Sequence, residues 1–215
     1  MSKARTESDL SAQLDSDLTT RLRELSDLKR AILDAEPISR TVLLKALVAL
    51  AYANWEGFVR YSATKYFEYI SIRRLAYIDL SQQFYANSFL ARLASFTTNK
   101  PTVKSRIEFV EEVLSGGTQR FSYINADLIN TGSNLKFDVL KDICLVCDIN
   151  VKVFQEHETF IDVFLLKRRN SIAHGDDATV GIDEIDSLVD NTIALMRTFK
   201  NELENKIYTK SYLRK

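Results

Sequence analysis

The sequence predicts an all-α fold, a helical bundle with one long helix near the N-terminus and another near the C-terminus. Apolar residues recur three or four positions apart through most of the chain, which is the spacing of one face of an α-helix. Only six glycines and two prolines occur in 215 residues, which argues against a β-rich or loop-rich architecture. A chain of this length can bury a sizeable core and suits one domain, residues 1–215.

The first predicted helix covers residues 8–35 and is amphipathic, with either Thr6 or Ser8 as its N-cap. Pro37 breaks this helix, because proline cannot donate the backbone hydrogen bond that a helix interior needs. The apolar face consists of residues three or four positions apart: Leu10, Leu14, Leu18, Leu22, Leu25, Leu28 and Ile32.

The second predicted helix runs from Ser39 to Ile72. Its segment Val42–Ala53 is apolar nearly all round, as expected for the central helix of a bundle. Lys45 interrupts this segment, which is also too short to span a bilayer, so no membrane association is expected. Glu56 follows this apolar segment, so its carboxylate is expected to be buried, and a buried carboxylate needs a hydrogen-bond or ion-pair partner. Arg168 is the candidate partner; the alternative is a half-exposed Glu56 at the rim of the core.

The rest of the chain alternates between helices and polar stretches. Residues 73–99 form a broken helical pattern, 103–114 a short amphipathic helix, and 115–134 a surface loop or lid. A helix is predicted over 135–146, and a final long helix over 182–208.

Both cysteines, Cys144 and Cys147, lie one helical turn apart. Without a second cysteine pair or nearby histidines they are better explained as core thiols than as a zinc site, and no metal or cofactor is expected. Nothing indicates a disulfide framework, and the N-terminus is polar rather than a signal peptide. A reducing, cytoplasmic environment is therefore expected.

The overall charge is balanced, with 29 Lys and Arg against 29 Asp and Glu. No global field attracts nucleic acid, so any RNA contact must come from local clusters. The basic tail, residues 209–215, either contacts RNA or is a solvated chain end.

The most reactive side chains gather in the stretch Lys167–Asp177, at the end of a helix predicted over 153–174. Asn170 and His174 lie about 40° apart on such a helix, and Arg169 lies about 140° from His174. Gly175 suits the position just beyond the helix end, so His174 sits where the helix dipole favours its protonated form. A histidine there can act as a general acid or base, and an arginine can hold a phosphate.

This helix is apolar on two sides, which predicts burial on two sides. One side faces the core of the monomer and consists of Ile161, Phe164, Leu165, Arg168 and Ile172. The other side consists of Val163, Asn170 and His174, flanked by Phe160 and Leu166. We expect this second side to meet another copy of the protein, so that the reactive groups lie in the cleft of a homodimer.

The order Arg169-Asn170, three further residues, His174 and Gly175 resembles the motif of the HEPN superfamily of small helical ribonucleases. That motif is an arginine and a histidine separated by four to six residues, and Arg168 fits it as well as Arg169 does. The segment 53–58, Ala-Asn-Trp-Glu-Gly-Phe, follows an aliphatic helix and is similar to stand-alone bacterial HEPN nucleases of toxin–antitoxin and phage-defence systems. The resemblance implies a HEPN-like helical bundle.

The same resemblance implies a metal-independent endoribonuclease that acts as a dimer with a composite site. The 2′-hydroxyl of RNA attacks the adjacent phosphate and leaves a 2′,3′-cyclic phosphate. His174 serves as general acid or base, and Arg169 stabilises the phosphorane. Asn170 orients the histidine or the scissile phosphate, and Arg168 and Glu56 are supporting residues. Besides RNA, an antitoxin or regulatory protein is an expected partner.

Three alternatives stay open on the sequence. The motif can be a plain helix end, with His174 satisfying carbonyls and the arginines paired with surface acids. The protein can be a non-catalytic helical module that binds a partner protein through the same face. Nucleotide binding between protomers uses the same residues.

Overall fold

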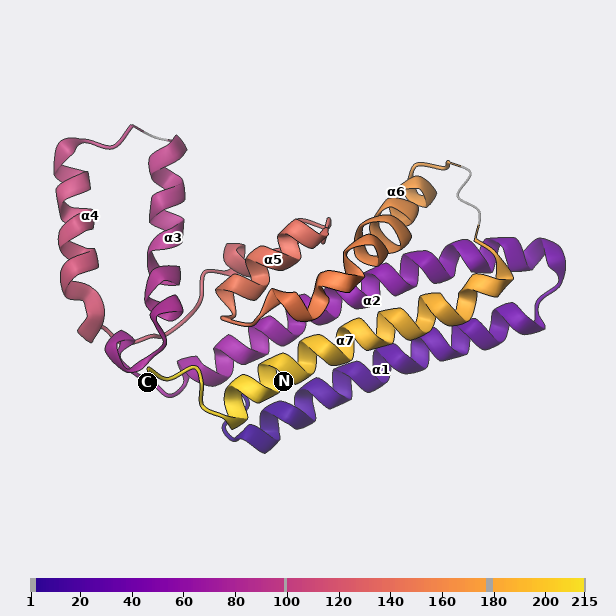
Figure 1. Ribbon diagram of the computed structural model, residues 1–215, viewed down its shortest axis with the longest axis horizontal. Coiled ribbons are helices and arrows are strands. Elements are labelled where there is room, and N and C mark those ends of the chain that lie inside the picture. Colours follow the sequence, from indigo (N-terminus) through magenta and orange to yellow (C-terminus); the bar gives the residue numbers. More distant parts are fainter. Residues whose placement is uncertain (1–2, 99, 177–179, 215) are drawn as a thin grey trace.

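Three long helices lie side by side and form the body of the protein (Figure 1). They are α1 (Glu7–Asp34), α2 (Pro37–Ser71) and α7 (Ile185–Tyr208). This computed structural model describes residues 3–98, 100–176 and 180–214. Within those ranges the chain is helical, with two isolated β-bridges and no β-strand, so the all-α prediction is confirmed.

Helix α1 begins where a capping box can form. The Thr6 hydroxyl accepts a hydrogen bond from the Asp9 amide at 3.0 Å, and the Asp9 carboxylate accepts one from the Thr6 amide at 2.9 Å. Thr6, and not Ser8, is therefore the N-cap. Pro37 separates α1 from α2 as predicted, but it is also the first residue of α2, a position where its missing amide costs nothing.

Helix α2 is the centre of the core. Trp55 is fully buried, and its ring centroid lies 6.3 Å from that of Phe154 and 6.4 Å from that of Phe199 on α7. By length and composition alone α2 could cross a membrane, but half of its most apolar 18-residue window is buried inside the protein. The core helix of a bundle has this character.

The segment 54–58 of α2 packs against α1 as well as the core. Arg21 Nη1 donates to the backbone and side-chain oxygens of Asn54, both at 3.3 Å. A Cβ atom at Gly57 would lie 2.8 Å from the same Nη1, so a larger residue at this position would displace the end of the Arg21 side chain.

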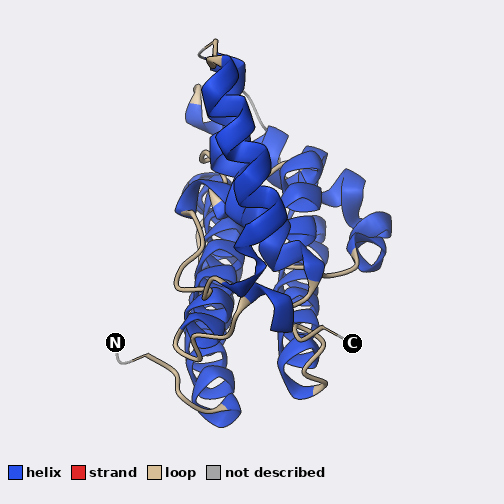
Figure 2. Cartoon of the chain, turned by 90° about the vertical axis from the view of Figure 1, so that its left-hand side faces the viewer, coloured by secondary structure: helices blue, strands red, loops and turns tan. Residues whose placement is uncertain are grey.

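Two shorter helices, α3 (Gln82–Thr98) and α4 (Val103–Ser115), form a hairpin that projects away from the bundle (Figures 1 and 2). The broken pattern predicted over 73–99 corresponds to a 3₁₀ turn, Tyr77–Asp79, followed by α3. The C-terminal tail packs beside this turn. Tyr212 is buried, and the Arg214 amide donates to the Asp79 carbonyl at 3.0 Å. The expected solvated end is thus wrong for the part of the tail up to residue 214, since backbone hydrogen bonds anchor it.

Helix α5 (Phe137–Val146) contains Cys144 and ends at its C-cap residue, Cys147. Cys144 and Cys147 are buried free thiols, and burial raises the pKa of Cys144 to about 12. The prediction of core thiols is confirmed.

The motif segment is not the single α-helix predicted over 153–174. A 3₁₀-helix (Val151–His157) leads into a π-helix (Phe160–Lys167), and α6 (Arg168–Ala173) completes it. A π-helix closes hydrogen bonds to the fifth residue instead of the fourth, so positions do not follow the 100° spacing of an α-helix. Phe164, expected in the core, is therefore 37% exposed, and Leu166, expected to flank the outer side, is buried.

Candidate functional site

The two adjacent arginines of the motif are directed at different partners. Arg168 donates from Nη1 and Nη2 to the two carboxylate oxygens of Glu184, both at 2.9 Å. The Gly181 amide donates to the same carboxylate at 3.2 Å. The hydrogen bonds from Arg168 are the main reason why the pKa of Glu184 lies below its usual value. This ion pair ties the start of α6 to the start of α7.

The predicted pairing of Arg168 with Glu56 is therefore wrong. Glu56 is half-buried and accepts a hydrogen bond from the Thr131 hydroxyl instead. The prediction assumed a regular α-helix up to Arg168, whereas the preceding π-helix and the nearby Glu184 decide where the guanidinium points. The alternative of a half-exposed Glu56 at the rim of the core is the one observed.

Arg169 lies against α2 and the loop before α5. Its guanidinium carbon is 4.2 Å from the centroid of the Tyr52 ring, and Nη2 donates to the Ser133 carbonyl. Its Nε is buried and has no hydrogen-bond partner among the described residues. No described carboxylate forms a salt bridge with Arg169, so its charge is not neutralised as that of Arg168 is.

Tyr52 holds this part of the site together, and the sequence analysis did not identify it. Its ring lies under Arg169, and its hydroxyl accepts a hydrogen bond from the Leu135 amide at 2.7 Å. Burial is the main cause that raises the pKa of Tyr52, so the phenol stays neutral. The spacing between Tyr52 and Glu56 points to this role, because Tyr52 precedes Glu56 by one helical turn and therefore lies on the same face of α2.

The C-terminal end of the predicted lid, residues 115–134, is attached to the middle of α2. Thr131 bonds to Glu56, and Leu135, just beyond the predicted range, bonds to Tyr52. Arg169 adds a third connection through the Ser133 carbonyl. Residues 131–135 thus form one wall of the site, and α2 forms its floor.

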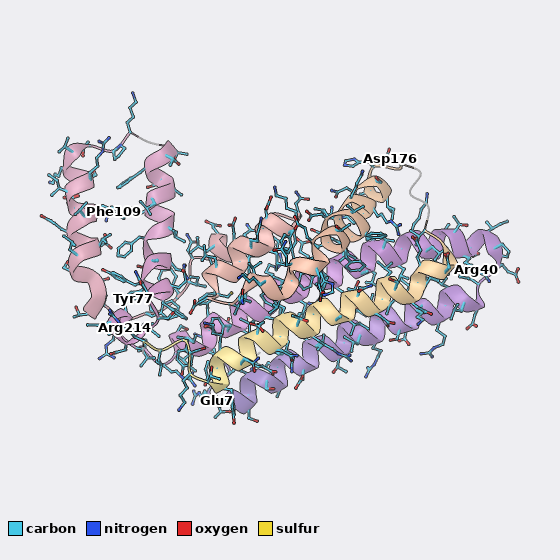
Figure 3. All side chains as sticks on the ribbon, in the orientation of Figure 1. Glu7, Arg40, Tyr77, Phe109, Asp176 and Arg214 are labelled. Carbon is cyan, nitrogen blue, oxygen red and sulfur yellow. The ribbon has the colours of Figure 1, made fainter. Side chains whose placement is uncertain are left out.

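His174 ends α6 at the protein surface. Its amide donates to the Asn170 carbonyl at 3.0 Å, and Gly175 follows with φ +79°, which confirms the predicted helix stop. The imidazole is exposed and has no hydrogen-bond partner among the described residues. Figure 3 shows the neighbouring Asp176 at the outer end of α6. Asp177, the last residue of the predicted stretch, lies outside the described residues.

The structure groups the predicted site residues into two places. Arg169 and Glu56 lie near the floor formed by α2, whereas His174 lies at the exposed end of α6, with the half-buried Asn170 one turn before it. No hydrogen bond joins Arg169 to His174 within the described chain. The outward side of the segment also carries apolar surface, since Val163 is 43% exposed.

The arrangement offers a cation and an imidazole for chemistry on an anionic substrate. Among the described residues, no group of three or more His, Cys, Asp or Glu side chains could hold a metal ion. The donors suited to a phosphate are the guanidinium of Arg169 and, when protonated, the imidazole of His174.

Comparison with known proteins identifies the family of the chain. No curated protein and no solved structure was found to match the chain. The model of one protein family, RiboL-PSP-HEPN, matches residues 16–205. That range includes α2, the wall at residues 131–135 and the complete motif segment. The chain therefore belongs to the RiboL-PSP-HEPN family of the HEPN superfamily.

Proposed function

We propose that this HEPN protein is a metal-independent endoribonuclease. One observation carries the proposal: Arg169 has no carboxylate partner among the described residues, and the same helix ends five residues later in an exposed imidazole. A cation without a counter-ion and an imidazole on the same short segment suit the stabilisation of a reacting phosphate and the transfer of its protons. The same contrast favours Arg169 over Arg168 as the catalytic arginine, since Glu184 already neutralises Arg168.

The proposed reaction is a transesterification within the RNA. The 2′-hydroxyl gives its proton to a general base and attacks the neighbouring phosphorus, and the bond from phosphorus to the 5′-oxygen breaks. The departing 5′-oxygen takes a proton from a general acid, which leaves a 2′,3′-cyclic phosphate and a 5′-hydroxyl. His174 exchanges these protons, Arg169 stabilises the negative phosphorane, and Asn170 orients the imidazole or the phosphate.

A homodimer completes the proposed site. Within one chain Arg169 and His174 are not hydrogen-bonded, and Val163 on the outward side is exposed. Two motif segments facing each other would place two imidazoles at one cleft, one as base and one as acid. Burial of the apolar outward side would supply the driving force for association.

The decisive experiment is cleavage of total cellular RNA in EDTA, followed by analysis of the RNA ends. The wild type should produce cyclic-phosphate ends, and His174→Ala should lower the rate by at least about 100-fold, because general acid–base catalysis contributes about that much. His157→Ala is the matched control, since His157 is the only other histidine and lies outside the motif. Equal cleavage by wild type and His174→Ala would refute the assignment. Loss of activity in EDTA that magnesium restores would refute metal independence.

The proposed dimer has its own test. Val163→Glu should break the motif-face contact and halve the mass measured in light scattering, because a carboxylate would be buried without a partner. Val42→Glu is a control, since Val42 is also exposed but lies near the start of α2. An unchanged mass for Val163→Glu would contradict association through this face.

A non-catalytic interaction module is the second candidate. Its supporting observation is that Arg169 already contacts Tyr52 and Ser133 within the chain, so it can serve as a structural tether. Absence of cleavage by the wild type, together with capture of a protein partner that His174→Ala still binds, would favour this reading. An antitoxin or regulatory protein that covers the exposed end of α6 is compatible with both candidates.

A further inference from the structure

Helix α4 is packed on one side only. Phe109 on this side contacts the rings of Phe89 and Phe96 on α3, with centroids 5.7 and 5.4 Å apart (Figure 3). Glu112, one turn further, forms an ion pair with Arg92 of α3. These contacts fix which side of α4 faces its neighbour in the hairpin.

The opposite side of α4 is an uncovered apolar row. The row consists of four residues with exposed fractions of 71, 54, 52 and 80%: Val103, Ile107, Val110 and Leu114. They lie within about 40° of Val103 on the helical wheel, whereas Phe109 and Glu112 lie about 120° and 180° away. A contiguous row of large apolar side chains on the surface of one chain marks an interaction site.

We infer that this row packs antiparallel against the same row of a second copy of the chain. Its spacing is four, three and four residues, which reads the same in both directions. A two-fold axis between residues 108 and 109 therefore sets Val103 opposite Leu114 of the second copy, and Ile107 opposite Val110. Such self-complementarity is what an isologous interface requires.

The charges beside the row favour the same orientation. Lys104 and Glu111 both lie about 80–100° to one side of the row, and Arg106 lies about 60° to the other side. Antiparallel helices bring equal sides together, so Lys104 of each copy lies about 3 Å along the axis from Glu111 of the other. Parallel helices would instead set Lys104 beside Arg106 of the second copy, where like charges repel.

The first test is the mass of the assembly in solution. Ile107→Glu should halve the mass measured by light scattering, while Leu93→Glu, which changes an exposed residue of α3, should leave it unchanged. Circular dichroism should show the same helix content in both variants. Val163→Glu separates this contact from the proposed motif-face dimer, because it should leave the α4 pair intact. An unchanged mass for Ile107→Glu would overturn the inference.

Cross-linking tests the antiparallel register. The double variant Val103→Cys/Leu114→Cys should form a disulfide-linked dimer under mild oxidation, since the two positions face each other across the two-fold axis. The native thiols are buried and do not interfere. Each single variant is a control, because its two copies of the new cysteine would lie about 16 Å apart along the axis. Efficient cross-linking of a single variant, or none of the double variant, would overturn the antiparallel arrangement.

Discussion

The three-helix bundle and the α3–α4 hairpin use their apolar residues in opposite ways. In α2 the large side chains of Trp55, Phe58 and Tyr66 are fully buried, whereas α4 has no buried residue at all. In the sequence, α4 shows the apolar periodicity of an amphipathic helix, whereas the central part of α2 is apolar nearly all round. Periodicity thus identifies a helix and its apolar face, but not whether the partner of that face belongs to the same chain.

The candidate site lies with the bundle and not with the hairpin. Tyr52 and Glu56 on α2 form its floor, and the ion pair between Arg168 and Glu184 connects it to α7. Figure 1 shows α6 above the bundle and the hairpin projecting from its other end. A site on a rigid scaffold can hold its groups in place, while the hairpin is free to make contacts of its own.

The largest effect is expected in the centre of the bundle. Trp55→Ala should lower the free energy of unfolding by about 3–5 kcal/mol, since it leaves a cavity among Phe154 and Phe199. Urea unfolding followed by circular dichroism is the suitable measurement, because Trp55 is the single tryptophan and its fluorescence would be lost. Trp55→Phe should cost less. A loss below about 1 kcal/mol for Trp55→Ala would mean that α2 is not the core helix.

A smaller and more local effect is expected in the hairpin. Phe109→Ala removes two ring contacts to α3, which together contribute about 1–2 kcal/mol. Hydrogen exchange should become faster within residues 82–115 and stay unchanged in α2, because the hairpin opens without the bundle. Val113→Ala on the same helix is the control, and it should change hydrogen exchange less, because Val113 makes no ring contact with α3 among the described residues. Faster exchange throughout α2 would show that the hairpin and the bundle unfold as one unit.

The elements that depend on local signals could be predicted from the sequence. The long helices start and end within a few residues of the expected positions, because leucine spacing, Thr6 and Pro37 act locally. The buried cysteines and the helix stop at Gly175 follow from similarly short-range rules. These features need no knowledge of the distant parts of the chain.

The internal geometry of the site could not be predicted in this way. The π-helix leaves no distinct sequence pattern, and it changes which residues of 160–167 face the core. The role of Tyr52 depends on residues 131–135 folding back onto α2, about 80 positions further along the chain. The ion pair between Arg168 and Glu184 likewise depends on where α7 begins.

That ion pair supplies the smallest of the expected effects and a pH dependence. The pKa of Glu184 is lowered from the usual 4.5, mainly by hydrogen bonds from Arg168. A carboxyl group whose pKa is lowered in the folded protein stabilises the fold at pH values above its pKa in the unfolded chain. This stabilisation is lost as the pH falls through the pKa of the group in the folded protein. Because Glu184 is 36% exposed, solvent screening limits this contribution to about 1 kcal/mol or less.

Glu184→Gln should therefore be less stable than the wild type at pH 7, and the difference should shrink below about pH 4.5 and vanish at lower pH. Urea unfolding of both proteins at pH 7, 5, 4 and about 3 measures it. Asp183→Asn is a matched control, because it removes a neighbouring carboxylate that does not pair with Arg168. The absence of any difference at pH 7 would mean that Glu184 stabilises the start of α7 through its hydrogen bond with Gly181, which glutamine retains, and not through its charge. The motif segment would then be tied to the bundle chiefly by the contact of Arg169 with Tyr52, as the hairpin is tied to it by the contacts of the Phe84 ring with Tyr66 and Phe67 on α2.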